Sequence, residues 1–281
     1  MSYFASFQLT PSAERTIRAD WYRPLGAASQ GTVLVAHGYK GFKNYGMFPR
    51  IGELLSESYD AVVFNFSHNG VGEELTEFTE LEKFARNTCS LEQEDLLALV
   101  EAVAGGTLSV GGGEQPRADR LFLLGHSKGG GGALLFGLDH PELVDGVISW
   151  NGISSFDLYS EEEKRLMREA GRAFTVNART KQQMPLDRVI LEDLEANAER
   201  FNLVGRIGGL RVPAALIQGE RDGKHLLAGS AWLKEAQPEL EWLMVPHGDH
   251  RFNTVHPYEG DTEAFLEAIR LTREWLDRHS K

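Results

Sequence analysis

The sequence predicts a doubly wound, mostly parallel α/β sheet, and two patterns lead to this prediction. Short, nearly continuous apolar runs recur along the chain, which is typical of strands covered by helices on both faces. Segments with apolar residues at helical spacing lie between these runs, so strands and helices alternate over most of the 281 residues. A chain of this length suits one large domain or one domain with an insertion.

The first elements differ from the rest, because residues 5–9 and 17–21 alternate apolar with polar side chains. This alternation predicts an antiparallel pair of half-buried strands. The later apolar runs predict strands of the parallel sheet at residues 33–36, 61–64, 121–124, 147–150, 213–217 and 242–245.

Capping signals indicate where helices begin. Ser90 opens a Ser-x-x-Gln capping box that leads into apolar residues at one-face spacing. Asp261 is expected to cap the final helix, which carries Phe265 and Trp275. The Gly-rich residues 105–113 lead into a polar loop, so we interpret them as a surface connection and not as a phosphate-binding loop.

A long segment interrupts the alternation of strands and helices. About 60 residues separate Trp150 from Pro213, far more than one crossover needs. Within them, residues 161–172 and 185–200 have a helical composition. We therefore predict an α/β core of residues 1–153 and 207–281, with residues 154–206 inserted as a helical cap over the carboxyl edge of the sheet. The alternative is a set of peripheral helices with no role at a site.

Composition restricts the partners and the compartment. The net charge is −12, from 41 acidic and 29 basic residues, which would repel nucleic acid and anionic membranes. Cys89 is the single cysteine, so no intramolecular disulfide can form. The sequence shows no secretory signal, and no apolar segment approaches the ~20 residues that span a bilayer. We expect a cytoplasmic protein that binds neither nucleic acid nor membranes.

Ser127 is the strongest candidate for a functional residue. The apolar run 121–124 leads directly into Gly125-His126-Ser127-Lys128-Gly129, and helix-forming residues follow. This is the Gly-x-Ser-x-Gly pattern of a nucleophile elbow, in which glycines relieve crowding around a sharp strand-to-helix turn. The serine then lies exposed at a positive helix N-terminus. The alternative is a turn whose glycines serve only close helix packing. No Gly-x-Gly-x-x-Gly or Gly-Lys-[Ser/Thr] motif for a nucleotide is present.

With this motif, the chain resembles the α/β-hydrolase superfamily over nearly its whole length. More narrowly, it resembles dienelactone-hydrolase-like and cinnamoyl-esterase-like serine carboxylesterases that carry a helical cap. Besides the elbow, the matching segments are residues 37–41, 64–70, 219–222 and 248–250. Dienelactone hydrolases use cysteine at the elbow, so the serine of this chain favours ordinary ester chemistry over lactone specificity.

A serine nucleophile needs a base, and the base needs a carboxylate that holds its tautomer. In this fold the chain order is Ser, then Asp or Glu, then His. Asp222 ends the turn after the strand at 213–217, which places its carboxylate at the same sheet edge as Ser127. Glu220 is the alternative acid, although it lies closer to the strand. Asp222 could also be a turn aspartate that caps the next helix.

Nine histidines compete for the role of base. The resemblance selects His250, which follows the last predicted strand by a few residues. His247 and His256 share this loop, and we expect His256 to fix the loop. The resemblance makes His37 and His126 structural neighbours of the site. A metal bound by the His-x-x-His pair is disfavoured, because no motif supplies a third ligand.

Two backbone N–H groups are expected to stabilise the oxyanion of a tetrahedral intermediate. The first belongs to Lys128 and the second to Tyr39, with Lys40 as the alternative. A plain turn at 37–38 is the other interpretation of that loop. Aromatic residues are expected at the rim of the pocket or in the cap, namely Tyr39, Phe42, Trp150, Phe156, Tyr159 and Phe252.

The sequence therefore predicts a carboxylesterase without cofactor or metal, acting on a small ester with an apolar or aromatic part. Ser127 would attack the ester to form an acyl-enzyme, with His250 as base and Asp222 as its orienting acid. An acyltransferase or peptidase with the same three residues is the first alternative. The second is a non-catalytic binding protein of the hydrolase fold. A homodimer is left open.

Overall fold

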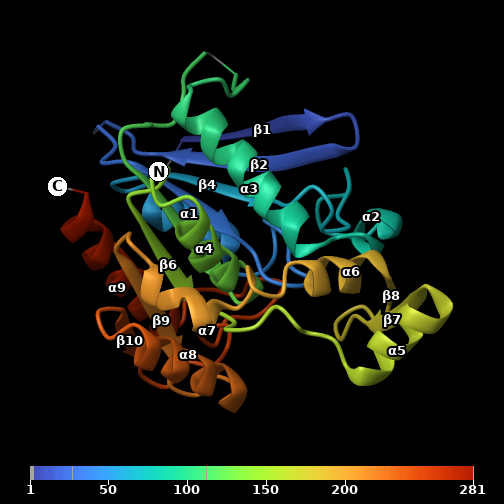
Figure 1. The fold of residues 1–281 in the computed structure, drawn as a ribbon. Coiled ribbons are helices and arrows are strands. Elements are labelled where there is room, and N and C mark those ends of the chain that lie inside the picture. The colour runs from blue at the N-terminus through green and yellow to red at the C-terminus, as the bar shows by residue number, and fades with distance from the viewer. Residues whose placement is uncertain (1–2, 27, 112, 281) are drawn as a thin grey trace.

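The structure is a computed structural model that describes residues 3–26, 28–111 and 113–280. Within these residues, an eight-stranded sheet has the spatial order β1-β2-β4-β3-β5-β6-β9-β10 (Figure 1). The strands are β1 (Tyr3–Ser12), β2 (Arg15–Arg23), β3 (Thr32–Ala36), β4 (Asp60–Asn65), β5 (Leu121–His126), β6 (Gly146–Trp150), β9 (Ala214–Gly219) and β10 (Glu241–Val245).

Both antiparallel pairs of the described sheet involve β2, which runs opposite to the other strands. β2 pairs antiparallel with β1 and β4, and all neighbours from β4 to β10 run parallel. Every residue of β3, β4, β5 and β6 is buried, which explains why these strands are continuous apolar runs in the sequence. The predicted fold class, a doubly wound and mostly parallel α/β sheet, is confirmed.

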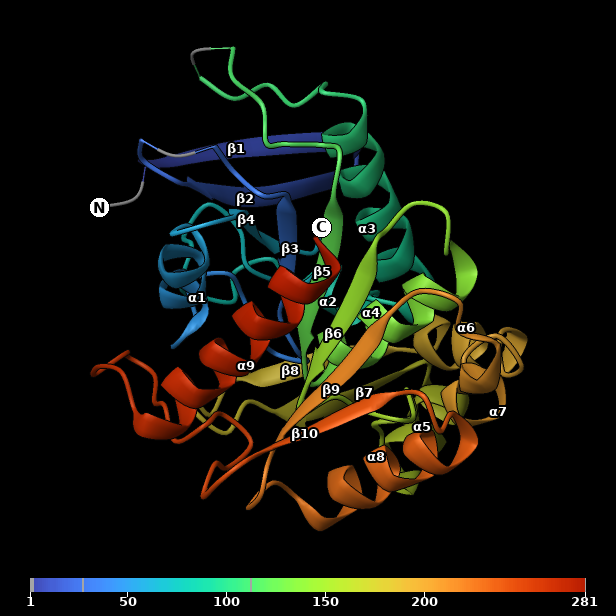
Figure 2. The same ribbon diagram turned by 90° about the vertical axis from the view of Figure 1, so that its left-hand side faces the viewer.

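Helices cover both faces of this sheet (Figure 2). Apolar residues of α1 and α9 pack against one face, and those of α3, α4 and α8 pack against the other. The helices are α1 (Phe48–Leu55), α2 (Leu81–Ala85), α3 (Cys89–Ala104), α4 (Lys128–Asp139), α5 (Glu161–Ala170), α6 (Val189–Ala196), α7 (Leu203–Arg206), α8 (Lys224–Ala236) and α9 (Glu263–His279). Throughout the described ranges, we find no helix with the length and apolar character needed to cross a bilayer.

Two predicted helix starts are wrong by one or two residues. Thr88, and not Ser90, caps α3 by accepting an N–H of its first turn. Ser90 lies inside that turn, and its hydroxyl donates to the Asp193 carboxylate of α6. Thr262 caps α9, one residue after Asp261. In both cases a neighbouring threonine hydroxyl reaches the unpaired N–H groups of the helix.

Residues 154–206, the predicted insertion, contain strands as well as helices. α5, α6 and α7 lie in it, and so does a two-stranded antiparallel sheet of β7 (Arg172–Val176) and β8 (Gln183–Asp187). Figure 1 shows α5, β7 and β8 as a lobe beside the main sheet. The helix expected from residue 185 onward is therefore wrong for its first residues, because Met184 and Leu186 are buried in the hairpin beneath α5 and α6.

The described residues of the Gly-rich stretch 105–113 form turns and irregular chain, as predicted, and residue 112 lies outside the described part.

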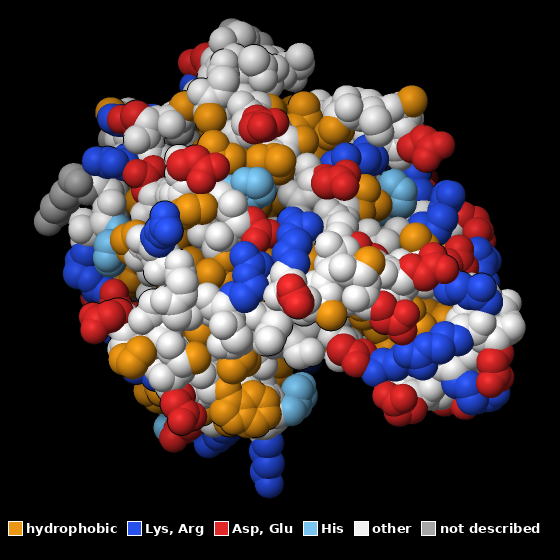
Figure 3. All heavy atoms as spheres, viewed as in Figure 1, with side chains coloured by type: hydrophobic (Ala, Val, Ile, Leu, Met, Phe, Trp, Pro, Cys, Tyr) orange, Lys and Arg blue, Asp and Glu red, His pale blue; other side chains and the backbone are white. Residues whose placement is uncertain are grey.

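On the insertion, acidic and basic side chains mix over the surface (Figure 3). Arg165 of α5, for example, pairs with Glu162 and Glu169 one turn to either side. Such exposed pairs add little stability, but they keep the lobe polar.

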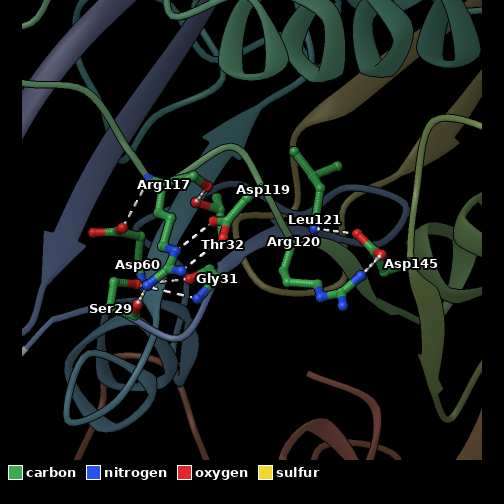
Figure 4. A network of polar contacts seen from close by, with 9 residues as sticks. All are labelled: Ser29, Gly31, Thr32, Asp60, Arg117, Asp119, Arg120, Leu121 and Asp145. Carbon is green, nitrogen blue, oxygen red and sulfur yellow. Dashed lines mark hydrogen bonds and ion pairs between the residues drawn. The ribbon is translucent and has the colours of Figure 1, made fainter. Parts of the chain in front are cut away.

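Acidic side chains accept hydrogen bonds at the amino ends of the central strands, at the edge opposite to Ser127 (Figure 4). Asp60, the first residue of β4, accepts a hydrogen bond from the Arg117 N–H at 2.9 Å and from the Trp21 indole at 2.8 Å. Asp145 likewise accepts the N–H of Leu121, where β5 begins, at 2.8 Å. These bonds join β4 to β2 and to the segment before β5, and they join β5 to the residue before β6.

We expect Asp60→Ala to lower the free energy of unfolding by about 2–4 kcal/mol, because it removes the acceptor of two buried donors. Urea denaturation followed by circular dichroism measures the change. Asp119→Ala is the matched control, since Asp119 pairs only with the exposed side chain of Arg117 and should cost less than about 1 kcal/mol. Equal effects of the two substitutions would contradict the role assigned to Asp60.

Candidate active site

Ser127 occupies a sharp turn between β5 and α4. Its backbone has φ 56° and ψ −116°, a conformation that L-residues rarely adopt. A Cβ on Gly125 would lie 2.0 Å from the Gly129 carbonyl oxygen, and a Cβ on Gly129 would lie 2.5 Å from that of His37. Both glycines are therefore required for the turn, which places the serine hydroxyl at the carboxyl edge of the sheet.

His250 lies in the loop after β10, and its side chain reaches Ser127, which follows β5. Its Nε2 is 3.1 Å from Ser127 Oγ, and its Nδ1 is 2.8 Å from Asp222 Oδ1. With the ring proton on Nδ1, His250 donates to Asp222 and offers Nε2 as an acceptor to the serine hydroxyl. Three side chains that are far apart in the sequence thus form one hydrogen-bonded line.

Asp222 is a buried carboxylate in the turn after β9. Burial opposes its charge, but hydrogen bonds outweigh this effect and lower its pKa below the ordinary value. The donors are His250, Gln218 Nε2 at 3.1 Å and the Gly223 N–H at 2.7 Å. The carboxylate is therefore ionised at neutral pH and holds the imidazole in one orientation.

The alternative acid and bases are engaged elsewhere. Glu220 accepts the backbone N–H of His247 at 3.0 Å, and both side chains are exposed. His256 accepts the Gly46 N–H at 2.9 Å and stacks on the ring of Tyr45. In the portion of the chain that the structure describes, no group of three or more His, Cys, Asp or Glu side chains is arranged to hold a metal ion.

His126 and Asn151 support the loop that carries His250. Both donate to the His250 carbonyl oxygen, His126 through Nε2 at 2.7 Å and Asn151 through Nδ2 at 3.0 Å. Burial, with the nearby His250 ring, lowers the pKa of His126 to about 3, so this side chain stays neutral. Asn151 also accepts the Gly219 N–H at 2.8 Å, which links the loops of both partners of Ser127.

Asn151 was not predicted from the sequence as a residue of the site. A feature of the sequence could have identified it, because Asn151 is a polar residue that directly follows the apolar run 147–150. It therefore lies at the carboxyl end of β6, the strand next to β5. Its φ of +47° is a left-handed conformation that asparagine tolerates better than most residues. The side chain is fully buried, and each of its polar atoms has a backbone partner.

The side chain of Lys128 points into the core. Its Nζ lies 2.9 Å from Glu92 Oε1 of α3, and both side chains are at most 9% exposed. Asn87 donates to the same carboxylate oxygen at 2.7 Å. Burial opposes the charge of Lys128, but the Glu92 carboxylate outweighs it and raises the lysine pKa. This buried ion pair joins the first turn of α4 to α3 directly behind Ser127.

The loop of residues 37–41 lies against Ser127. A Cβ on Gly38 would be 2.9 Å from Ser127 Cβ and 3.4 Å from its Oγ, so only glycine fits there. Among the residues that the structure describes, the N–H groups of Tyr39, Lys40 and Lys128 donate to no protein acceptor. They remain available for an anionic oxygen next to the serine.

A cavity of about 440 Å³ opens beside Ser127 and His250, which is within the range of small-molecule sites. It lies between the core and the turn of the β7–β8 hairpin. The residues that line it are Gly38, Tyr39, Lys40, Gly41, Tyr45, Met47, Phe48, His126, Ser127, Asn177, Ala178, Arg179, His250, Arg251, Thr254 and His256.

Six aromatic residues were predicted at the rim of the pocket or in the cap, and for three of them the prediction is wrong. Tyr39 lines the cavity, but Phe42, Trp150 and Phe252 are fully buried core residues. Phe156 borders a separate groove, and Tyr159 packs edge-on against Tyr39. Aromatic residues next to strand ends were attributed to the pocket, whereas most of them fill the core under the loops. Two aromatic residues that were not predicted, Tyr45 and Phe48, line the cavity together with Tyr39.

Solved structures share this architecture. Dienelactone hydrolase from Anabaena variabilis is 16% identical, with a TM-score of 0.62 over 99% of this chain and 98% of that chain. Est1E from Butyrivibrio proteoclasticus is 11% identical, with a TM-score of 0.68 over 99% and 100%. Monoacylglycerol lipase from Paleococcus ferrophilus is 15% identical, with a TM-score of 0.66 over 99% of each chain.

These likenesses show that the chain has the α/β-hydrolase fold, as the resemblance implied. No protein-family model matches the sequence. No curated protein matches it either.

We expect Glu92→Leu to lower the free energy of unfolding by about 3–5 kcal/mol, because it leaves the buried charge of Lys128 without a partner. Replacing both members, in Glu92→Leu with Lys128→Met, should recover most of this loss. Thermal and urea unfolding of the single and double variants measure the coupling. A double variant as unstable as the single one would show that the ion pair is not the cause.

Proposed function

We propose that the protein is a serine hydrolase that cleaves carboxylic ester bonds through an acyl-enzyme intermediate. The observation that carries this proposal is the hydrogen-bonded line from Ser127 through His250 to Asp222 at the mouth of a cavity. A nucleophile, a base and an orienting acid are then in the required order and distance. The α/β-hydrolase fold, which a dienelactone hydrolase and a monoacylglycerol lipase share, supports the same reaction class.

In the first half-reaction, Ser127 Oγ attacks the ester carbonyl carbon while its proton moves to His250 Nε2. The carbonyl oxygen becomes an anion, which the N–H groups of Tyr39 and Lys128 stabilise. Because Lys128 begins α4, its N–H also benefits from the positive end of the helix dipole. The imidazolium then protonates the leaving oxygen, the alcohol departs, and the acyl group stays on Ser127.

In the second half-reaction, a water molecule replaces the alcohol. His250 Nε2 accepts a proton from this water as its oxygen attacks the acyl carbon. The same two N–H groups stabilise the second tetrahedral intermediate. The Ser127 oxygen then leaves, takes the proton from His250, and the carboxylic acid is released. Asp222 stays ionised in both halves and stabilises the imidazolium that forms each time.

A fluorophosphonate probe should label the protein at neutral pH, with one equivalent bound, and Ser127→Ala should abolish the labelling. The phosphonyl group mimics the tetrahedral intermediate, so labelling needs both an activated serine and the anion site. Intact-protein mass spectrometry measures the adduct. An unlabelled wild-type protein would refute the proposal. Assays with ethyl esters, peptides and added amines then separate hydrolysis of esters from peptidase or acyl-transfer activity.

Asp222→Asn should lower kcat on the order of 10³–10⁴-fold, because the amide carries no charge to stabilise the imidazolium and its NH₂ group can donate to His250 Nδ1, which favours the wrong tautomer. Steady-state hydrolysis of a neutral ester measures the loss. Glu220→Gln is the matched control, because its carboxylate faces His247 at the surface. If Glu220→Gln loses activity and Asp222→Asn keeps it, the assignment of the acid is reversed.

A further inference from the structure

The cavity beside Ser127 is positively charged, although the whole protein carries a net charge of −12. Lys40, Arg179 and Arg251 line it. No Asp or Glu is among the described residues that form its wall. On the surface of the insertion, in contrast, acidic and basic side chains are mixed (Figure 3). The chain thus concentrates cations where its proposed substrate binds.

Neither arginine has a carboxylate partner. Within the described residues, no carboxylate oxygen lies within 4.0 Å of the Arg179 or Arg251 guanidinium. Arg251 Nη1 is 3.4 Å from the Tyr45 hydroxyl, and the Arg179 guanidinium lies 6.0 Å from the centre of the Phe42 ring. Elsewhere on the β7–β8 hairpin, Arg172 pairs with Asp187. The charges of Arg179 and Arg251 are therefore left for a ligand.

Lys40 contributes charge but is already bound. Its Nζ donates to Thr175 Oγ1 at 3.1 Å and to the Val176 carbonyl oxygen at 3.0 Å. The negative charge of Glu163, which hydrogen-bonds to Thr175, partly compensates the positive charge of Lys40. The two arginines are consequently the groups able to turn toward an anion.

The two guanidinium groups approach the cavity from different parts of the molecule. Arg251 directly follows His250 in the loop after β10, and Arg179 lies in the turn between β7 and β8. Both residues line the same cavity of about 440 Å³ as Ser127. A guanidinium presents paired donors that match the two oxygens of a carboxylate, so a carboxylate is the anion this pair suits best.

We propose that the substrate is an ester that itself carries a carboxylate, which Arg179 and Arg251 bind. This inference rests on the hydrolase function proposed above and names its substrate class. The carboxylate belongs either to the acyl part, so that the product is a dicarboxylic acid, or to the alcohol part, so that the product is a hydroxy acid. The bond cleaved and the proton transfers are those of the ester reaction described above.

Two pairs of esters test the proposal. Monoethyl adipate carries the charge on the acyl part, and its ω-amide is the neutral equivalent. 4-Acetoxybutanoate carries it on the alcohol part, and 4-acetoxybutanamide is the neutral equivalent. We expect kcat/KM for the charged member to exceed that of the amide at least about tenfold in one pair, as for a charge-assisted hydrogen bond. This ratio should fall with added salt.

Substitutions identify the binding groups. Arg179→Gln and Arg251→Gln should each lower the ratio of charged to neutral kcat/KM about tenfold, mainly through KM. Arg211→Gln is the matched control, because Arg211 is exposed and precedes β9, at the opposite edge of the sheet. The ratio in Arg211→Gln should equal that of the wild type. Arg179→Glu should reverse the charge preference in favour of ethyl 6-aminohexanoate.

The outcomes separate this proposal from the one on which it rests. The carboxylate site is refuted if the wild type hydrolyses the neutral, amide-bearing esters as well as the charged esters. It is also refuted if the arginine substitutions leave the ratio of charged to neutral kcat/KM unchanged. In either case the hydrolase function stands. If no ester is hydrolysed and the fluorophosphonate does not react, both proposals fail. Calorimetric binding of monoethyl adipate and 4-acetoxybutanoate to Ser127→Ala gives a readout without turnover. Addition of Arg251→Gln should weaken this binding about tenfold, and undiminished binding would contradict the site.

Discussion

The turn at Ser127 is the constraint on which the arrangement of the whole site depends. Its left-handed backbone is held because α4 packs tightly against β3 and β5, at contacts where Gly125 and Gly129 leave no room for a side chain. The same close approach brings Gly38 against the serine. The proposed nucleophile and the proposed N–H donors are therefore positioned by one packing arrangement, and neither can move far without the other.

Parallel pairing explains why distant residues meet. β5, β6, β9 and β10 are neighbours that run in the same direction, so the loops that follow them leave from one edge. Asn151 uses this geometry, because its side chain bonds the backbone of both Gly219 and His250. The proposed acid and the proposed base are thus tied to each other through their main chains as well as through their shared hydrogen bond.

The parts of the fold that could be predicted are those governed by local pattern. β3 to β6 are buried on both faces, so their apolar runs identify them, and Ser127, Asp222 and His250 each follow a strand that was recognised. The β7–β8 hairpin was missed because its short strands acquire burial only by packing under α5 and α6. The cavity lining was mispredicted for a related reason. Tyr45, Arg179 and Arg251 line one cavity only because the tertiary structure brings them together. No spacing in the sequence predicts this proximity.

Lys40 has a consequence for motion in this molecule. It follows Tyr39 in the loop beside the serine, and its ammonium group is hydrogen-bonded to two residues of β7 in the insertion. A displacement of that hairpin pulls directly on the loop that supplies one of the proposed N–H donors. The position of the proposed N–H donor at Tyr39 therefore depends on this hairpin as well as on the packing of Gly38 against the serine.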